Sequence, residues 1–397
     1  MRFPFVFAVG LFLTGCAARP PAAPPPPTGM TTAWVSFDSR GLRGSGASGL
    51  ADRASGRHVT IDDPVRIASV SKLVVALGVM RLAEQGRIDL DADVSRQLGW
   101  PLRNPAFPDV PITLRMLLSH TSSVKDEGDN YVLPLGRTVR ETAALPETFD
   151  RAHRPGAFFR YSNLNYPLIG SVLEKATGER FDRLMSKLVL QPLGLDACFN
   201  YTTCSDAKLA RMVVLYRPDG SVARDDLRGR RPDCPVATTG PACELEKYEL
   251  GSNGALFSPQ GGLRASMTDL ATIGQMLLNK GRHRGRLFLS QASVDAVLRP
   301  LWTYDGRNGD TSDGLYCAYG LASQSLPVPA AGCRDQLLGS RKLVGHAGEA
   351  YNLRSGLWID PAARVGIAYF AANTSEEASS SAYSPTEAQL ASKLPAR

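Results

Sequence analysis

A serine and a lysine that could together form a nucleophile and its base lie at the start of an apolar segment. Ser69 to Lys72 reads SVSK and opens a run of leucine, valine, alanine and methionine that extends to Gln85, with Gly86 behind it. This pattern predicts a buried helix, on which residues three apart share a face. A serine hydroxyl needs a base, and a desolvated lysine can be that base. The helix N-terminus would add N–H groups for an oxyanion.

The serine–lysine spacing is not conclusive by itself. It recurs at Ser205 and Lys208, in a polar stretch that contains cysteines and has no apolar helix behind it. Ser69 would also fit a helix N-cap, and Lys72 would fit an exposed side chain whose stem covers apolar surface. Further residues must decide between a catalytic and a structural interpretation.

Tyr161 and Asn163 form the only Y-x-N sequence among the twelve tyrosines. They begin a segment with helical periodicity that extends to Thr177 and that Gly178 should end. A tyrosine beside a lysine ammonium has its anion favoured, so Tyr161 could carry protons. Asn163 could hydrogen-bond Lys72 and a substrate amide. The alternative is a half-buried tyrosine and a helix-capping asparagine.

A third group of polar residues lies near the end of the chain. His346 and Gly348 belong to the sequence GHAGE, which ends at Glu349 and precedes a strand-like segment over residues 357–370. We expect a strand beside a cleft here, and Gly348 would allow a substrate to approach the backbone closely. A single histidine such as His346 is otherwise most simply a hydrogen-bonded structural residue.

The elements that must position these residues are strands at both ends of the chain and helices between them. Residues 31–41 alternate as a strand does, and 357–370 read as a hairpin. A capping box at 266–269 begins a helix that Gly281 should end, and the sequence SPTE at 384–387 begins a terminal helix.

This order of elements predicts the fold class. We expect an α+β fold, an α/β sandwich with a mainly antiparallel sheet built from both chain ends and flanked by helices. The sheet would come from about 31–68 and 250–397, and a mostly helical subdomain would be inserted over about 75–250, within a domain of residues 31–397.

The N-terminus resembles an export signal. In residues 1–15, Arg2 precedes a short apolar run that ends in LTGC, similar to the lipobox of bacterial lipoproteins. We expect cleavage before Cys16, a lipid on that cysteine and a proline-rich linker over 16–30. An ordinary secretory signal with a chance cysteine is the alternative. The expected location is the periplasm or cell surface of a bacterium, anchored to the membrane by the lipid.

The other cysteines indicate disulfides rather than a metal site. An oxidising compartment permits pairing, and the sequence alone does not choose among the fifteen possible pairings of six cysteines. Sequential pairing is the simplest of these, because it closes short local loops among Cys198, Cys204, Cys234, Cys243, Cys317 and Cys333. There is no C-x-x-C pair, and the five histidines are dispersed. We expect neither metal nor organic cofactor.

The composition excludes some classes of function. The 397 residues are 43% hydrophobic and 21% charged, as in globular proteins. The net charge of +7 comes from scattered basic residues, so nucleic-acid binding is not expected. No apolar run is long enough to span a bilayer.

The serine–lysine pair, the Y-x-N sequence and the H-x-G strand, in this order, resemble the serine β-lactamase and penicillin-binding-protein superfamily. The chain is most similar to its class C β-lactamase branch, which includes D-Ala-D-Ala carboxypeptidases, D-aminopeptidases and family VIII esterases. Over about 31–371, the stretches that carry the resemblance are RIASVSKLVVALGVMRLAEQGRIDLD, ITLRMLLSHTSS, RPGAFFRYSNLNYPLIGSVLEKATG, QPLGL and GGLRASMTDLATIGQMLL.

The resemblance implies a role for each site residue. Ser69 would be the acylated nucleophile, Lys72 and Tyr161 its proton-transfer partners, and Asn163 would position Lys72 and the substrate amide. The backbone N–H groups of Ser69 and Glu349 would form the oxyanion hole.

The chain departs from the family pattern at two places, and the first bears on the substrate. His346 takes the place of the lysine in the K-T-G triplet that helps hold a substrate carboxylate, and Gly348 keeps the place of its glycine. Neutral imidazole is a weaker carboxylate partner at pH 7, and Arg354 is a candidate substitute. The usual H-T-S-G reads HTSS from His120 to Ser123, and we expect this second change to affect structure more than chemistry.

The predicted function is an exported serine hydrolase that acts through acyl-Ser69. We expect a small-molecule or peptidoglycan-fragment substrate, with β-lactams or D-amino-acid peptides preferred over simple esters, and a monomer. A family VIII-type carboxylesterase is the alternative. A degenerate penicillin-sensing or wall-binding lipoprotein is the non-enzyme alternative, although it predicts loss of Lys72 or Tyr161. An α/β-hydrolase would need a G-x-S-x-G sequence, which is absent.

Overall fold

The computed structural model describes residues 29–374 and 380–396. The predicted signal segment, Cys16 and almost all of the proline-rich linker lie outside the described residues.

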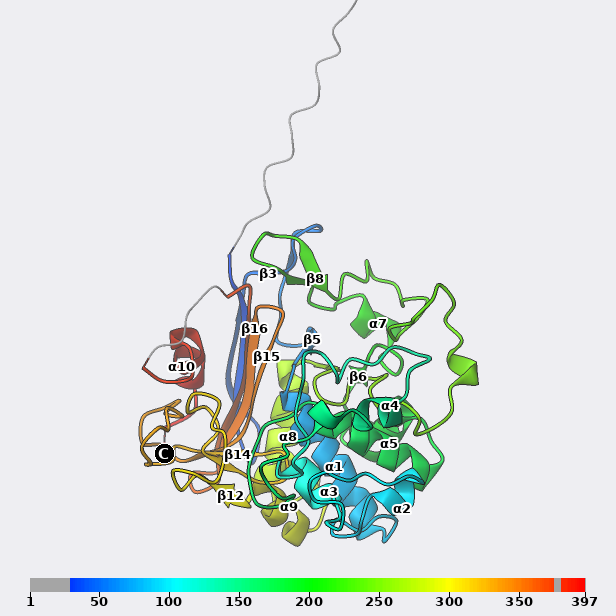
Figure 1. The fold of residues 1–397 in the computed structure, drawn as a ribbon. Helices are drawn as coiled ribbons and strands as arrows, with labels where there is room; N and C mark the ends of the chain where they lie inside the picture. The colour runs from blue at the N-terminus through cyan, green and yellow to red at the C-terminus, as the bar shows by residue number, and fades with distance from the viewer. Residues whose placement is uncertain (1–28, 375–379, 397) are drawn as a thin grey trace, which may run out of the picture.

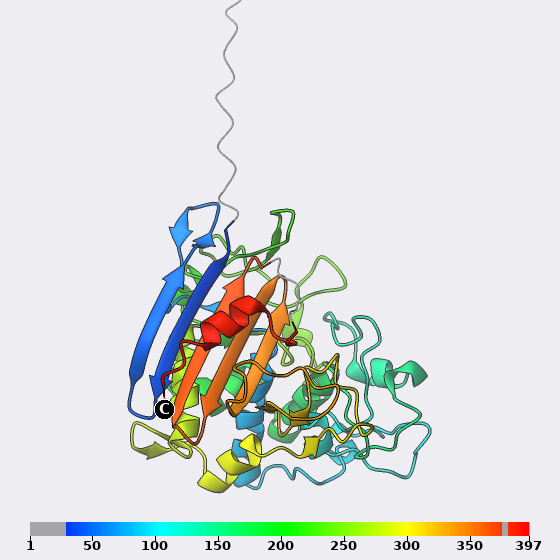
Figure 2. The ribbon, with the colours of Figure 1, turned by 90° about the vertical axis from the view of Figure 1, so that its left-hand side faces the viewer.

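One layer of the molecule is an eight-stranded antiparallel sheet built from both ends of the chain (Figures 1 and 2). Its strand order is β12 (Trp302–Thr303), β13 (Ala318–Tyr319), β14 (Gln324–Leu326), β15 (Leu343–Ala350), β16 (Leu353–Asp360), β17 (Val365–Ala372), β1 (Thr31–Asp38) and β2 (Leu42–Ser48). The first strand pairs with the last, so Thr31 lies opposite Ala372. This confirms the predicted α+β fold, and the hairpin strands are longer than predicted.

The sheet is covered on both faces. Helix α8 (Met267–Leu278) packs on one face against β1 and β17, and α10 (Pro385–Ala391) packs on the opposite face, where it crosses the strands in Figure 2. Strand β17 is consequently buried along its whole length, as its sequence VGIAYFAA requires. Both helices begin at the predicted capping boxes, and α8 ends at Leu278, before the predicted Gly281.

The region between the two parts of the large sheet contains mainly helices and only short strands. Helix α1 (Val70–Glu84) buries twelve of its fifteen residues, and α5 (Asn165–Thr177) ends at Gly178, which has a φ of 67°. Shorter helices surround them: α2 (Ser95–Leu98), α3 (Leu114–Leu118), α4 (Val139–Ala143), η1 (Pro146–Thr148), α6 (Phe181–Met185), η2 (Ser186–Leu190), α7 (Asp206–Leu209), η3 (Leu245–Lys247) and α9 (Gln291–Leu298).

Short strands and disulfides organise the irregular segments. The small sheets are β5 (Val65–Arg66), β9 (Leu263–Ala265) and β6 (Cys198–Phe199); β3 (Leu50–Asp52) and β4 (Arg57–His58); β7 (Leu215–Tyr216) and β8 (Val222–Arg224); and β10 (Arg282–His283) and β11 (Arg286–Leu287). The six cysteines pair sequentially, as predicted: Cys198–Cys204, Cys234–Cys243 and Cys317–Cys333.

Two features are absent from the described residues. None of the helices in 29–374 and 380–396 is long and apolar enough to cross a membrane. Over the same residues, the histidine, cysteine and acidic side chains form no group that could hold a metal ion.

Candidate active site

The chain turns sharply before the first long helix, and Ser69 lies at that turn. Ala68 has a φ of 45°, a left-handed conformation that costs a non-glycine residue on the order of 1 kcal/mol. The Ser69 hydroxyl makes no capping bond to the backbone of α1, so the simple N-cap interpretation is wrong. Ser69 instead lines a cavity with a volume of about 940 Å³.

Lys72 is fully buried one turn along α1. Its Nζ lies 3.0 Å from Ser69 Oγ, 2.8 Å from Asn163 Oδ1 and 2.7 Å from the carbonyl oxygen of Gln260. Burial lowers the pKa of Lys72 from 10.5 to about 7, although the charge of Asp126 opposes this shift. A large fraction of Lys72 is therefore neutral at pH 7, which a base requires.

These contacts determine how a neutral Lys72 amine can accept a proton. The carbonyl oxygens of Asn163 and Gln260 can only accept hydrogen bonds, so they take the two N–H groups of the amine. The nitrogen lone pair must then face Ser69, whose hydroxyl is the only one of the three partners that can donate. The geometry is therefore suited to transfer of the Ser69 proton to Lys72.

Asp126 fixes the orientation of the Asn163 amide. Its Oδ2 accepts a hydrogen bond of 3.0 Å from Asn163 Nδ2 and one of 2.9 Å from the Asn163 backbone nitrogen. Its Oδ1 accepts from Ser162 Oγ and from the Leu164 backbone nitrogen. Because the carboxylate takes the amide nitrogen, Asn163 Oδ1 faces Lys72. No sequence motif marks Asp126, and our sequence analysis missed it.

Tyr161 is held between two rings and stays protonated. Its ring stacks on Tyr316 at 4.5 Å and on His120 at 4.3 Å, and Lys72 Nζ lies 4.9 Å from its centroid. Burial raises the pKa of Tyr161 well above its usual value, and Tyr316 adds to the shift while Ser69 opposes it. The expectation of a favoured phenolate was therefore wrong, because desolvation outweighs the lysine charge. Its buried hydroxyl forms no hydrogen bond of normal geometry with another described residue.

His120, in the HTSS sequence, supports this arrangement from behind. Its Nδ1 accepts a hydrogen bond of 3.1 Å from the Ser162 backbone nitrogen, and burial keeps its pKa well below the usual value. His120 is therefore a neutral acceptor that fixes the start of the Y-x-N segment. Its role is structural, as the sequence analysis expected for HTSS.

Gly348 allows strand β15 to pass close to the start of α1. A Cβ at this position would lie 2.5 Å from the Ile67 carbonyl oxygen and 3.1 Å from the Ser69 backbone nitrogen. The close approach that needs this glycine is thus made by the protein's own backbone, whereas we had expected the substrate to make it. Gly348 and Glu349 both line the cavity beside Ser69.

His346 lies behind the cavity wall. It is fully buried, its Nε2 is 2.8 Å from the Tyr319 hydroxyl, and its Nδ1 contacts the Ala347 carbonyl oxygen. Burial, with the nearby Lys72 charge, lowers the pKa of His346 to about 3. The side chain is neutral and does not line the cavity, so the structure does not place it where it could bind a substrate.

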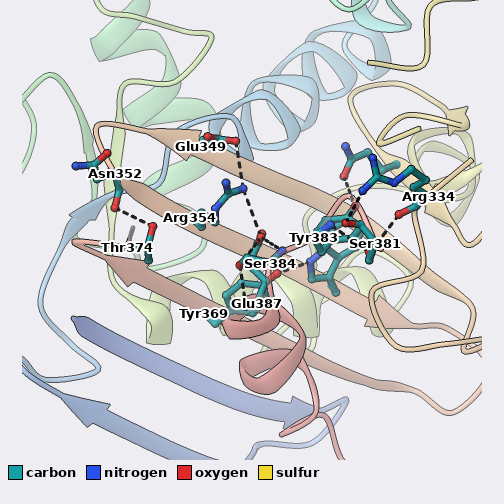
Figure 3. Close-up of polar contacts among 12 residues, drawn as sticks. Arg334, Glu349, Asn352, Arg354, Tyr369, Thr374, Ser381, Tyr383, Ser384 and Glu387 are labelled. Carbon is teal, nitrogen blue, oxygen red and sulfur yellow. Dashed lines mark hydrogen bonds and ion pairs between the residues drawn. The ribbon is translucent and has the colours of Figure 1, made fainter. Parts of the chain in front are cut away.

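Arg354 lines the cavity, but its guanidinium group already forms ion pairs with two acidic side chains. It forms ion pairs of 3.3 Å with Glu349 and 3.5 Å with Glu387 of α10, between which it lies in Figure 3. Glu387 is itself buried and caps its helix through Ser384. Arg354 therefore joins the C-terminal helix to the strand beside Ser69, and its charge is largely neutralised.

The second serine–lysine pair has a structural role. Ser205 caps the short helix α7 and bonds Asp196, and Lys208 Nζ donates to the Asp62 carbonyl oxygen on the surface. The first pair alone combines a cavity, a buried lysine and an oriented partner.

Comparisons with known proteins identify the protein family to which this fold and site belong. The family model described as Beta-lactamase matches residues 31–392, and the chain belongs to that family. It is accordingly a serine hydrolase.

Individual relatives are similar over much of the chain. Esterase EstB of Burkholderia gladioli is 28% identical and covers 81% of this chain and 82% of its own length. D-alanyl-D-alanine-carboxypeptidase/endopeptidase AmpH of Escherichia coli K12 is 28% identical over 48% of this chain and 49% of its own. A class C beta-lactamase structure from Rhodobacter sphaeroides is 17% identical, with a TM-score of 0.64 and coverage of 91% and 92%, and it supports the fold.

Proposed function

We propose that the protein hydrolyses carboxylic esters through an acyl intermediate on Ser69. The observation that carries this proposal is the neutral, buried His346, which leaves strand β15 without the cation that would hold a β-lactam or peptide carboxylate. The similarity to an esterase over most of both chains supports the same choice. The sequence analysis ranked β-lactams and D-amino-acid peptides higher, and that ranking stays a prediction for the experiment below.

In the proposed acylation, the neutral Lys72 amine removes the Ser69 proton while Oγ bonds to the ester carbonyl carbon. The carbonyl electron pair moves to its oxygen, which the backbone N–H groups of Ser69 and Glu349 would stabilise. The carbon–oxygen bond to the alcohol then breaks. Protonated Tyr161 gives its proton to the departing oxygen and regains one from the Lys72 ammonium.

Deacylation reverses these roles. A water molecule adds to the acyl carbon and gives up a proton to Lys72. The Ser69 oxygen leaves, takes a proton back and releases the carboxylic acid. No group outside the chain, other than water, is needed for this sequence.

The test compares an ester with a β-lactam on the same protein. We expect hydrolysis of p-nitrophenyl hexanoate by the wild type and its loss in Ser69→Ala. Ser205→Ala is the matched control and should retain activity. Intact-protein mass with benzylpenicillin tests the alternative. A penicilloyl adduct that requires Ser69, together with no ester turnover, would contradict the ester proposal, and its lifetime would separate a β-lactamase from a penicillin-binding protein.

We also propose that the protein is exported and carries a lipid on Cys16. The lipobox-like sequence and the three disulfides of the described residues support this, because disulfides persist in oxidising compartments. We expect the mature chain to begin at an acylated Cys16 and to sediment with membranes, and Cys16→Ser to abolish the acylation. Mass spectrometry of the mature N-terminus would decide the question, and an unmodified Cys16 in the mature protein would refute it.

A further inference from the structure

Two arginines line the cavity that contains Ser69 without an acidic partner. The Arg66 side chain forms no hydrogen bond or ion pair with any described residue, and its Nε is buried without a partner. Arg224, at the end of β8, is exposed and forms no ion pair within the part of the chain that the structure describes. Partly buried guanidinium groups normally have partners, so Arg66 is an exception that needs a cause.

The surroundings of Arg66 make its lack of a partner costly. It lies directly opposite Arg264 on the paired strands β5 and β9, and like charges in that position repel each other. Arg264 is neutralised by Asp225 at 2.7 Å, whose carboxylate attracts Arg66 only from a distance. Burial, followed by the Arg264 charge, lowers the pKa of Arg66 to about 10. An anion bound here would offset both the burial of the Arg66 charge and its repulsion from Arg264.

Tyr351 brings the two arginines together. The Arg66 guanidinium lies 5.4 Å and the Arg224 guanidinium 5.3 Å from the centroid of its ring. Tyr351 and Asn352 form the turn between β15 and β16, and the φ of 54° at Tyr351 is unfavourable for a bulky side chain. Against the effect of burial, both arginine charges lower the pKa of Tyr351, and its hydroxyl also hydrogen-bonds Arg224. A guanidinium group has five N–H donors, and ring contacts use none of them, so both arginines keep donors for an anion.

The other charges of the cavity are already engaged. Arg354 pairs with Glu349 and Glu387, and Arg264 pairs with Asp225. Asp129 also lines the cavity and accepts a hydrogen bond from Tyr131. The capacity to bind an anion is therefore concentrated at the two arginines beside Tyr351.

We propose that Arg66 and Arg224 form a subsite for a carboxylate on the substrate, in the part that extends from Ser69 toward Tyr351. The planar guanidinium group matches a carboxylate through two parallel hydrogen bonds. This inference rests on the proposed ester hydrolysis and adds its substrate class, esters that carry a free carboxylate. The anion would lie beside the turn that follows strand β15, away from the position of His346 within that strand.

Equilibrium binding to Ser69→Ala protein measures the subsite without turnover. The probes are the mono-anilides of adipic and suberic acid, compared with the uncharged anilides of hexanoic and octanoic acid. We expect at least one acidic anilide to bind about tenfold or more tightly than its uncharged counterpart, the effect of charge-assisted hydrogen bonds. Arg66→Gln and Arg224→Gln should each remove most of that preference. Arg230→Gln, which changes an exposed arginine of the same loop outside the cavity, is the control.

Each outcome has one meaning. Equal binding of acidic and uncharged anilides, or equal losses in Arg66→Gln, Arg224→Gln and Arg230→Gln, would overturn the subsite. Arg224 is exposed, so its variant keeps the test valid if Arg66→Gln folds poorly.

Turnover separates the subsite from the proposed function. Wild-type protein that hydrolyses neither p-nitrophenyl hexanoate nor mono-p-nitrophenyl adipate, yet prefers acidic anilides, would refute the function and leave the subsite. Hydrolysis of both esters without anion preference in binding would refute only the subsite.

Discussion

The carboxylate of Asp126 should set the pH at which the nucleophile becomes active. It accepts hydrogen bonds from Asn163, which in turn contacts Lys72, and its charge favours the Lys72 ammonium. Replacing Asp126 by Asn removes that charge and weakens the orientation of Asn163. Lys72 acts as a base when it is neutral, so kcat/KM should rise as pH passes the pKa of about 7. In Asp126→Asn this rise should move to lower pH.

The size of the shift follows from the geometry. Hydrogen bonds of 2.8 and 3.0 Å on either side of one amide place the two charges no more than about 8 Å apart. Coulomb's law gives about 0.5 to 2 kcal/mol at that separation for effective dielectric constants of about 80 to 20. This corresponds to a downward shift of about 0.4 to 1.5 pH units. The maximal kcat should fall as well, because Asn163 loses its charged acceptor.

The assay is the pH dependence of kcat/KM for p-nitrophenyl hexanoate, followed at the isosbestic wavelength of p-nitrophenol. Glu127→Gln is the matched control, since it removes an exposed carboxylate of the same segment that pairs with Lys125. Its profile should coincide with that of the wild type. An acidic limb that is unmoved or moves upward in Asp126→Asn would refute the assignment of Lys72 as the base. A wild-type limb above pH 10 would indicate Tyr161 in that role instead.

Three further predictions follow from the same contacts. Lys72→Met should abolish activity yet stabilise the fold by about 1–3 kcal/mol. The lowered pKa means that burying the charged form of Lys72 costs about 5 kcal/mol, which the variant avoids. The carbonyl oxygens of Asn163 and Gln260 lose their donor in the variant, and this offsets part of the gain. Wild-type stability should rise between pH 7 and 10, where the unfolded chain binds more protons, and urea unfolding should show no such rise from this residue in the variant. Replacing both Cys317 and Cys333 by Ser should lower the free energy of unfolding by about 3 kcal/mol, because the disulfide closes a loop of 16 residues. The variant should also have a lower kcat, because Tyr316 would stack less firmly on Tyr161. A lowered Tm with an unchanged kcat would contradict the effect on activity. His346→Lys should lower Tm by several degrees without conferring penicillin hydrolysis, since the new charge would be buried, and penicillinase activity in that variant would show that the position does reach the cavity.

Much of the fold could be predicted from the sequence because the signals are local. The apolar run of α1, the capping boxes of α8 and α10 and the turn glycine Gly178 each fix an element within a few residues. The disulfides were predicted for a similar reason, because each closes a short loop. The strand ends were less accurate, since pairing with neighbouring strands extends a strand beyond its alternating core.

The site was predicted only in part because its electrostatics depend on tertiary contacts. Ser69 and Lys72 share a helix turn, so their proximity follows from spacing. The Gln260 carbonyl and Asp126 come from segments with no motif, and burial of His346 follows from packing beneath Tyr319. The sequence therefore indicated which residue types are present, while the direction of their pKa shifts required the structure.

The cost of burying Lys72 and the ability of Ser69 to react have one origin. Helix α1 is apolar on nearly every side, so Lys72 loses its water and the free-energy advantage of its ammonium form. Burial alone would lower the pKa of Lys72 without orienting its lone pair toward Ser69. The carbonyls of Asn163 and Gln260 supply the direction, because each can engage only an N–H group and together they leave the lone pair to Ser69. A variant that kept Lys72 buried but turned the Asn163 amide around would retain the lowered pKa and still lose the nucleophile, which is why Asp126 matters to the reaction although it lies beyond Asn163.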